Sequence, residues 1–378
     1  MASISTRRKT PAPLGAGILQ GDYRPQPVKR VEIPKPTGGV RKLGIPTVTD
    51  RLIQQMLLQV LQKQFDPTFS EYSYGFRPGR SAHQAIEQAQ AYIKEGFQWV
   101  VDIDLEKFFD RVNHDILMSL LAKRVSDKRV LKLIRGFLNA GVFVMCKVIG
   151  SEEGTPQGGP LSPLLSNITL DVLDQELEKR SHKFVRYADD CNIYVKTERA
   201  GIRVMESVSR FLVRNLKLIV NQRKSAVGRV YERKFLGFSF STGECVKRRI
   251  APQSIQRFKS AVRQLTRRTS GRNLESTIVE LSRYLRGWIG YYGFCEATSV
   301  LKGLDSWLRR RLRSQLWKQW KTPKNRFEEL RRRGVSKAWA KLTSGSGKGP
   351  WHISCSWSLH KALPNKYFDA LGLPRLAS

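Results

Sequence analysis

Hydrophobic residues along the first 240 positions alternate between helical and strand-like spacing. Apolar side chains recur every three to four residues after Ser81, after Asn113, after Ser162-Pro163 and over 202–212, which predicts four helices. Between the helices lie short runs rich in β-branched and aromatic residues, which predict strands. The pattern therefore predicts helices packed on a mostly antiparallel sheet, an α+β architecture. The expected strands cover residues 99–104, 183–187, 191–196 and 217–220.

In the last third of the chain the strand signal fades and only helical spacing remains. Three apolar stripes, over 255–265, 274–289 and 300–312, predict three helices whose polar faces carry arginine. Breaks that contain Pro or Gly, at 321–324 and 344–350, separate these helices from a shorter final segment. We therefore expect an all-helical unit followed by a small C-terminal region.

An acidic pair, Asp189 and Asp190, occupies the predicted turn between two strands, in the run Tyr-Ala-Asp-Asp. Two like charges at one turn repel each other, which favours a bound cation, and carboxylates on rigid strands are ligands that Mg²⁺ prefers. A solvated turn is the alternative, since Tyr-x-Asp-Asp arises by chance in roughly one chain in thirty of this length. The motif alone is therefore suggestive.

A second acidic segment strengthens the metal interpretation. Trp99 begins an apolar run that ends in Asp102 and Asp104, which share one face because strand side chains alternate. Asp104, at the mouth of the strand, is the better candidate ligand, and Asp102 is expected to be a structural neighbour. With Asp189, Asp104 could hold two Mg²⁺ ions about 3.5 to 4 Å apart, one activating a 3′ hydroxyl and one stabilising a leaving pyrophosphate. The sequence therefore predicts nucleotidyl transfer.

Further blocks follow one another along the chain, at 33–46, 73–81, 154–167 and 234–238. Together with the acidic segments, they resemble the reverse transcriptases encoded by bacterial group II introns, also called maturases. The resemblance runs from about Tyr23 to the C-terminus, and it implies a right-hand polymerase fold with fingers, palm and an α-helical thumb. The implied segments are a basic leader at 1–21, fingers and palm at 22–245, a thumb or maturase domain X at 246–321, and a DNA-binding region at 322–378.

The resemblance also implies roles for individual residues. Asp104, Asp189 and Asp190 would be the catalytic ligands of two Mg²⁺ ions, for which Mn²⁺ could substitute. Phe109 would be an aromatic gate that clashes with a ribose 2′ hydroxyl and so favours deoxynucleotides. The arginines expected on RNA or DNA are Arg309, Arg310, Arg311 and Arg313.

The resemblance also implies that other residues contact the incoming nucleotide. Lys35 and Arg41 match fingers residues that clasp a triphosphate. Gln157 and Gly158 lie in the block at 154–167, which matches the palm block of this family, where an amide and a small residue suit close approach. Lys224 resembles a palm lysine near the phosphates. A simple turn is the alternative for Gly158, and a surface position is the alternative for Lys224.

The charge of the chain supports a polyanionic partner. It carries 67 Lys and Arg against 32 Asp and Glu, a formal net charge of +35. Residues 241–378 hold 29 basic but only 8 acidic side chains, so the C-terminal third is the more basic part. The expected partners are group II intron RNA, an RNA template with a DNA primer, deoxynucleoside triphosphates and target DNA.

Features that the sequence lacks limit the cellular compartments and the activities that we expect. No apolar stretch approaches the roughly 18 residues of a membrane span, and five widely spaced cysteines fit a reducing compartment. We expect a bacterial cytoplasmic protein, with an organellar transit peptide as the alternative reading of the basic leader. Relatives usually begin with a longer N-terminal extension, which puts tight intron binding and template switching in question. Many also end in a His-Asn-His endonuclease domain, so second-strand DNA cleavage is not expected.

Three functional hypotheses remain open from the sequence. The first is an RNA-directed DNA polymerase of a group II intron that also binds its intron RNA to promote splicing and retrohoming. The second is a maturase that no longer polymerises and acts as an RNA-binding splicing factor. The third is a domesticated reverse transcriptase that serves phage defence.

Overall fold

The acidic strand and the acidic turn lie side by side in one antiparallel sheet, which we call the main sheet. In the computed structural model, the main sheet has the strand order β6-β7-β3-β8. Tyr187 pairs with Asp190 across the β6–β7 turn, and Ile103 pairs with Cys191 between β3 and β7. This register brings Asp104, the residue after β3, to the end of the sheet that carries the acidic turn. The strands are β3 (Trp99–Ile103), β6 (Lys183–Tyr187), β7 (Asp190–Val195) and β8 (Ala226–Arg229).

The chain folds as two compact units, unit 1 (Met1–Arg233) and unit 2 (Lys234–Ser378), each with buried apolar residues. The four segments implied by the resemblance stay a prediction. The structure describes residues 14–34, 38–144, 147–150, 153–243, 245–267 and 271–377.

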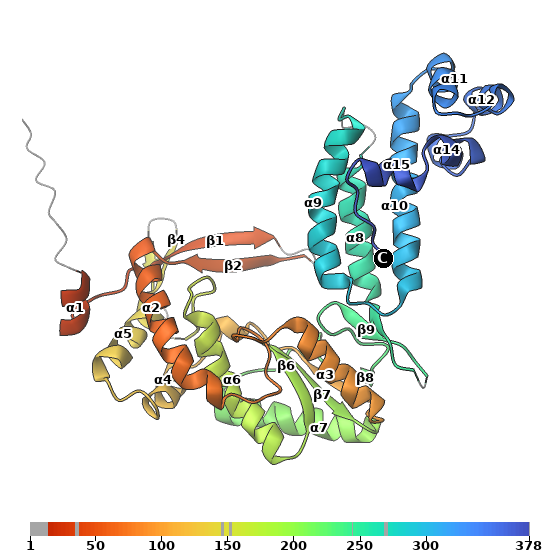
Figure 1. The fold of residues 1–378 in the computed structure, drawn as a ribbon. Coiled ribbons are helices and arrows are strands. Elements are labelled where there is room, and N and C mark those ends of the chain that lie inside the picture. Colours follow the sequence, from red (N-terminus) through yellow and green to blue (C-terminus); the bar gives the residue numbers. More distant parts are fainter. Residues whose placement is uncertain are drawn as a thin grey trace, which may run out of the picture. The chain divides into compact units, whose positions relative to one another are not determined.

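Helices cover the main sheet and confirm the predicted helical stretches of unit 1. Ser81 caps α3 with a full capping box, and Asn113 caps α4 by accepting a hydrogen bond from the Ile116 amide. Figure 1 shows α7 lying along one face of the sheet, where it contacts β3, β7 and β8. These helices are α3 (Ala82–Lys94), α4 (His114–Ala122), α6 (Ser162–Lys179) and α7 (Glu198–Phe211), with short turns η1 (Asp66–Thr68), η2 (Phe108–Asp110) and η3 (Leu212–Leu216).

The strand predicted at 217–220 is wrong. Lys217 has a left-handed backbone with φ of 57°, which ends the helical segment before it, and only Val220 forms a bridge, to Leu105. The segment nevertheless has a structural role, because Ile219 O accepts from the Glu106 amide beside the end of β3. An apolar run does not reveal whether a partner strand is present.

A second sheet, with the order β2-β1-β4-β5, joins two N-terminal strands of unit 1 to two strands from its middle. Its strands β1 and β2 pair antiparallel and include most of the block at 33–46, which resembles the fingers block of the family, whereas β1 and β4 pair parallel. The elements are α1 (Leu14–Gln20), β1 (Val28–Pro34), β2 (Val40–Ile45), α2 (Val48–Phe65), α5 (Lys128–Asn139), β4 (Val142–Val144) and β5 (Lys147–Ile149).

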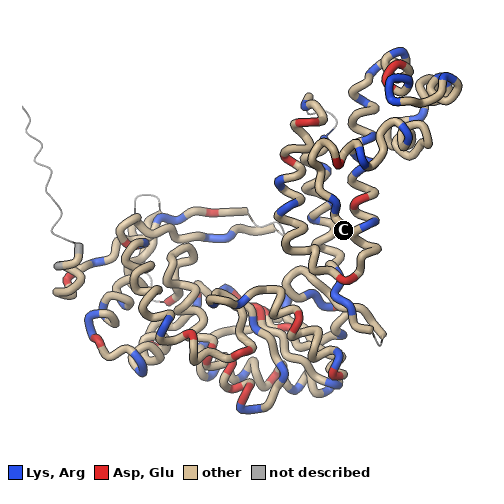
Figure 2. The backbone as a smooth tube through the Cα atoms, viewed as in Figure 1, with Lys and Arg blue, Asp and Glu red and all other residues tan. Residues whose placement is uncertain are grey.

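Unit 2 is helical apart from one short hairpin, and its three long helices confirm the three predicted stripes. Figure 2 shows Lys and Arg along these helices and on the smaller helices that follow. Across the described residues, no helix combines the length and apolarity that crossing a membrane requires. The elements are β9 (Phe238–Phe240), β10 (Arg248–Ile250), α8 (Pro252–Leu265), α9 (Leu274–Tyr292), α10 (Thr298–Gln319), α11 (Pro323–Arg332), α12 (Lys337–Ser344), α13 (Pro350–Ile353), α14 (Trp357–Ala362) and α15 (Asn365–Ala370).

Candidate active site

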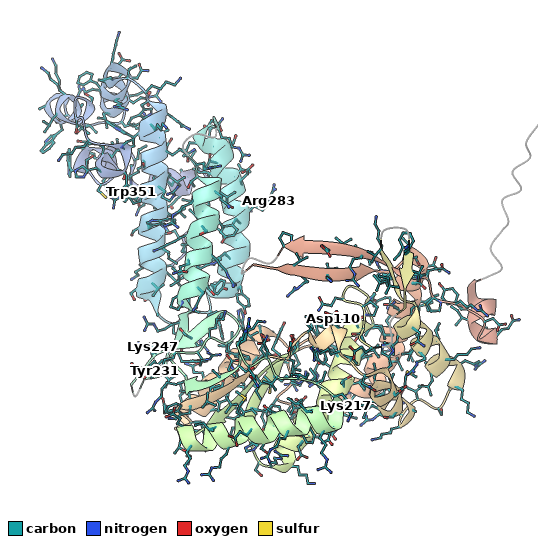
Figure 3. All side chains as sticks on the ribbon, turned by 180° about the vertical axis from the view of Figure 1, so that it is seen from behind. Asp110, Lys217, Tyr231, Lys247, Arg283 and Trp351 are labelled. Carbon is teal, nitrogen blue, oxygen red and sulfur yellow. The ribbon has the colours of Figure 1, made fainter. Side chains whose placement is uncertain are left out.

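Asp104 and Asp189 line one open cleft of about 810 Å³ in unit 1. The cleft is bounded by the end of β3, the β6–β7 turn, η2, β2 and the loop 219–224. Figure 3, viewed from behind, shows Asp110 at the end of η2, below the β1–β2 hairpin. Six of the residues predicted for the site line this cleft: Arg41, Asp104, Phe109, Gln157, Asp189 and Lys224.

The acidic turn is held in a conformation that few residues adopt. Ala188 has a φ of 58°, in the left-handed region, and is buried. This backbone directs Asp189 into the cleft, whereas Asp190 begins β7 and does not line it. Desolvation by the surrounding protein raises the pKa of Asp189, and the negative charge of Asp104 raises it further. Desolvation and the neighbouring carboxylates, Asp189 first, raise the pKa of Asp190 to about 7.

The loop after residues 217–220 holds the backbone of Asp104. Its amide donates to Ser225 Oγ at 2.9 Å, and its carbonyl accepts from the Asn221 amide at 2.8 Å. The Lys224 ammonium lies 3.1 Å from each carboxylate oxygen of Asp104. Lys224 thus lines the cleft, and in this structure its ammonium pairs with the carboxylate of Asp104.

Asp102, two residues earlier on the same face, forms a partly buried ion pair with Arg233. Arg233 donates to Asp102 Oδ2 from Nη2 at 2.5 Å and from Nε at 3.1 Å. The same Nη2 donates to the Lys224 carbonyl at 2.8 Å. Arg233 therefore connects Asp102 to the loop that carries Lys224. The sequence did not predict this role for Arg233.

The donor set in the cleft fits a hard divalent cation. Asp104 and Asp189 offer only carboxylate oxygens, and the Lys224 ammonium beside Asp104 marks a position that attracts positive charge. Within the described ranges, no three carboxyl, imidazole or thiol side chains lie close enough to one another to hold a metal ion by themselves. This arrangement suits Mg²⁺, which proteins often bind through one or two carboxylates together with substrate phosphates.

Two of the next three predicted nucleotide contacts line the cleft. Arg41 is exposed on β2 and lines the cleft, and its positive charge partly offsets the rise in the pKa of Asp189 that desolvation causes. Phe109 packs edge-on against buried Phe108, with ring centroids 5.2 Å apart, and lines the cleft from η2. Lys35 lies outside the described residues.

The palm block folds as a tight loop against β2. Gln157 lines the cleft, and its carbonyl accepts from the Gly44 amide at 2.8 Å. Gly158 has a φ of 131°, and a Cβ there would lie 2.9 Å from the Gly44 carbonyl oxygen. The turn therefore requires glycine at this position, and Gly158 does not itself line the cleft.

A buried ionic network beneath the acidic turn was not visible in the sequence. Arg186 is fully buried and forms a fork with Asp174, from Nε to Oδ1 at 2.7 Å and from Nη2 to Oδ2 at 2.5 Å. Its remaining nitrogen, Nη1, donates to Asn167 Oδ1 at 3.0 Å and to the Ala188 carbonyl at 2.9 Å. Arg186 thereby ties the backbone of the acidic turn to α6, so we regard it as a positioning residue.

The block at 73–81 packs under the same turn. Asn167 Nδ2 donates to the Gly75 carbonyl at 2.9 Å, and the Tyr74 amide donates to the Arg186 carbonyl at 2.9 Å. A Cβ on Gly75 would lie 2.2 Å from the Ala188 nitrogen, so only glycine permits this approach. The block at 73–81 thus packs against the acidic turn and helps to hold it in place.

The four arginines predicted to bind RNA or DNA divide into two pairs, and the prediction is corrected for one pair. Arg309 is fully buried and pairs with Asp305 and Asp369, and Arg313 is buried and donates to the Leu363 carbonyl. Helical spacing placed both on a polar face, but the C-terminal helices cover that face. Their guanidinium groups are therefore structural.

The other pair is only partly covered. Arg310 stacks over Trp351, with the guanidinium carbon 4.0 Å from the ring centroid, and Arg311 donates to Thr266 Oγ1 at 2.8 Å. Their contact with nucleic acid stays a prediction.

Comparison with known families agrees with the site. The model of the family "Reverse transcriptase (RNA-dependent DNA polymerase)" matches residues 33–240, more than half of the chain. A second model, "Group II intron, maturase-specific domain", matches residues 255–334. The first match contains every residue that lines the cleft.

Individual proteins give the same picture. Protein YkfC of Escherichia coli (strain K12) is 32% identical over 61% of this chain and 70% of its own length. Group II intron-encoded protein LtrA of Lactococcus lactis subsp. cremoris is 40% identical over 45% of this chain, but the match spans only 28% of LtrA.

A solved structure of apo telomerase from Candida tropicalis covers 93% of this chain and 69% of its own, at 12% identity and a TM-score of 0.49. Because that score is below 0.5, the fold assignment rests on the sheet topology and on the family matches.

Proposed function

This chain belongs to the reverse transcriptases, the family of RNA-dependent DNA polymerases, and to those with a group II intron maturase-specific domain; from this premise we propose that it extends a DNA primer on an RNA template at the cleft of Asp104 and Asp189. One observation carries the proposal. Two carboxylates from separate segments and the cations of Arg41 and Lys224 line the same cleft. Acids for metal binding and cations for a triphosphate are the two requirements of nucleotidyl transfer.

Divalent metal dependence is general to this family. We infer two Mg²⁺ ions, with Mn²⁺ as a substitute, held by Asp104 and Asp189 with Asp190 beside them. When bound, such ions activate the primer 3′ hydroxyl and neutralise the charge of the leaving pyrophosphate. Asp190 is the weakest ligand of the three, because it does not line the cleft.

The protein's own groups would orient the incoming deoxynucleoside triphosphate. Arg41 offers a planar fork for phosphate oxygens. Lys224 would exchange Asp104 for a phosphate once a cation neutralises that carboxylate, because its ammonium is exposed and joined by a flexible stem. Phe109 would lie against the sugar and exclude a 2′ hydroxyl. Gln157 would contact the nucleotide or template, with Gly158 shaping its loop.

Primer extension on an RNA template tests this proposal. Wild type should extend with deoxynucleotides in Mg²⁺ or Mn²⁺, and Asp189→Ala should abolish extension. Asp115→Ala is a matched control, since that aspartate pairs with Arg135 on the surface of unit 1 and does not line the cleft. Extension by Asp189→Ala at the wild-type rate would contradict the proposal.

Nucleic acid is the class of partner that the two matched domains share. We propose that unit 2 binds group II intron RNA to promote splicing, and that target DNA is the second substrate, as retrohoming requires. The two named relatives are bacterial, which favours the bacterial cytoplasm.

A maturase that no longer polymerises is the alternative, and the maturase-specific match favours it equally. In that case Asp189→Ala would splice as wild type does, and the wild type itself would not extend a primer.

A further inference from the structure

The tryptophans of unit 2 range from fully buried to about half exposed. Trp317 is 1% exposed, and Trp288 and Trp320 are 8% exposed, as expected for aromatic side chains in a helical core. Trp339 is 49% exposed and Trp357 is 53% exposed. Large aromatic side chains held in solvent are costly, and contiguous exposed apolar groups usually mark a binding surface.

Trp339 and Trp357 lie side by side with Leu342 and Lys361 nearby. We call these four residues the tryptophan surface. The two indole rings lie with centroids 5.5 Å apart and an interplanar angle of 47°. Leu342, one helical turn after Trp339, is 67% exposed. The Lys361 ammonium, one turn after Trp357, lies 5.1 Å from the centroid of the Trp357 ring.

The helices beneath this surface are firmly packed. Leu330 of α11, Ala340 of α12 and Leu359 of α14 are fully buried. Thr343 and Ser358 share a buried hydrogen bond of 2.8 Å between their hydroxyl oxygens. The tryptophans therefore point outward from a scaffold with its own core, and their exposure does not come from a poorly packed segment.

The charge around the tryptophan surface has one sign. Between Ser336 and Phe368 the sequence contains five lysines and no aspartate or glutamate. Lys337 and Lys341 are exposed on α12, as Lys361 is on α14. A surface for a neutral or basic protein partner would not need this bias, whereas a polyanion would be attracted to it.

Trp351 lies nearby in the fold but is already occupied. Arg310 of α10 stacks on its ring and donates to its backbone carbonyl at 3.0 Å. Figure 3 shows Trp351 beside α10, at the small helices. It therefore serves as an internal comparison, because its cation is close and fixed by a hydrogen bond, whereas the Lys361 ammonium near Trp357 is more distant and belongs to an exposed side chain.

We propose that the tryptophan surface binds a single-stranded stretch of nucleic acid by stacking unpaired bases on Trp339 and Trp357 while the lysines contact its phosphates. Aromatic faces combined with backbone-tracking cations are the means by which proteins hold single strands without reading sequence. A duplex keeps its bases stacked on one another, so it could use the lysines but not the indoles. The proposal rests on the proposed function for nucleic acid as the class of partner, and it assigns residues and a strand form to the DNA-binding region predicted at 322–378.

Site-specific crosslinking tests the proposal on the full chain. Oligonucleotides substituted with 5-bromodeoxyuridine or 5-bromouridine would be irradiated with the protein, and the crosslinked tryptophans identified by peptide mass spectrometry. The yield at Trp357 as a function of oligonucleotide concentration gives the affinity of this surface alone, whatever else the chain binds. Comparing the two oligonucleotides separates DNA from RNA as the source of the strand.

The expected result is a saturable crosslink at Trp357 with single strands and little with a hairpin duplex. Trp339→Ala should raise the half-saturating concentration at least fivefold, since stacking on an aromatic side chain changes affinity by roughly 5- to 150-fold per base. Trp339→Phe should stay close to wild type. Val279→Ala, an exposed apolar residue of α9, is the matched control and should have no effect.

Two results would overturn the proposal: no crosslink at Trp339 or Trp357 at any concentration, or an unchanged titration in Trp339→Ala. The surface would then be assigned to a protein partner. Asp189→Ala separates this test from the proposed function, because a polymerase-dead variant must crosslink as wild type does. Thermal unfolding followed by tryptophan fluorescence checks that each variant is folded.

Discussion

The acidic cleft of unit 1 and the tryptophan surface of unit 2 are built in opposite ways. The acidic turn of the cleft depends on a buried ion pair, Arg186 with Asp174, and Arg186 fixes the turn through the Ala188 carbonyl. The tryptophan surface depends on apolar packing below and leaves its functional rings in solvent. The difference follows from the chemistry, because in-line transfer tolerates little displacement whereas stacking on a flexible strand tolerates much.

The largest effect is expected from breaking the support of the acidic turn. Arg186→Met leaves Asp174 as a buried, unpaired carboxylate, so the free energy of unfolding of unit 1 should fall by about 3 to 5 kcal/mol. Primer extension should fall with it, because the Ala188 carbonyl loses its donor. Hydrogen exchange of β6 and β7 amides is the suitable measurement, since every tryptophan except Trp99 lies in unit 2.

A double variant separates stability from positioning. Arg186→Met with Asp174→Leu removes both charges and should recover most of the hydrogen-exchange protection. Primer extension should remain low, because the turn is still without its anchor. Full recovery of extension would mean that Arg186 is only a structural residue.

A smaller loss is expected from the buried arginine of unit 2. Arg309→Met leaves Asp305 and Asp369 without their shared partner, but both carboxylates keep some solvent. We therefore expect unit 2 to lose about 2 to 3 kcal/mol, measured by denaturant unfolding with tryptophan fluorescence. RNA affinity measured below the unfolding transition should be unchanged, and a specific loss of affinity in folded protein would restore Arg309 as an RNA contact.

A pH-dependent effect on stability is expected at Asp171, which lies next to the Arg186–Asp174 pair in unit 1. Burial first, and Asp174 second, raise the pKa of Asp171 from 3.8 to about 6. The folded state binds this proton more tightly than the unfolded state does, so the carboxylate costs stability as the pH rises from about 4 to about 6 and costs the full amount above that. Asp171→Asn should therefore be more stable than wild type by about 1 to 3 kcal/mol at pH 7, and equal to it near pH 4.

The measurement is the difference in unfolding free energy between variant and wild type across that pH range. Asp115→Asn, on an aspartate whose side chain is 83% exposed, is the control and should show a much smaller difference than Asp171→Asn at pH 7. A pH-independent gain in Asp171→Asn would indicate altered packing instead of a removed charge.

Local patterns predicted what local forces determine. Ser81 and Asn113 could be identified as helix caps, and Asp104 as the end of a buried strand, because capping and alternation act over a few residues. Arg186 was not identified, because its strand is buried on both faces and its partner Asp174 lies on a helix twelve residues earlier. Helical spacing likewise gave Arg309 a polar face without showing that a later helix covers it.

The smallest effect is expected from an exposed arginine of unit 2. Arg283 lies on the surface of α9, as Figure 3 shows, so Arg283→Ala should change stability by no more than about 0.5 kcal/mol. If this surface contacts RNA phosphates, the plot of log affinity against log salt should become less steep by about 0.7 to 0.9 for the lost contact. Arg203→Ala, an exposed arginine of α7 in unit 1, removes the same charge and should leave the slope unchanged. An equal change in both variants would mean that RNA responds to the net charge of the whole chain and that unit 2 offers no particular binding surface.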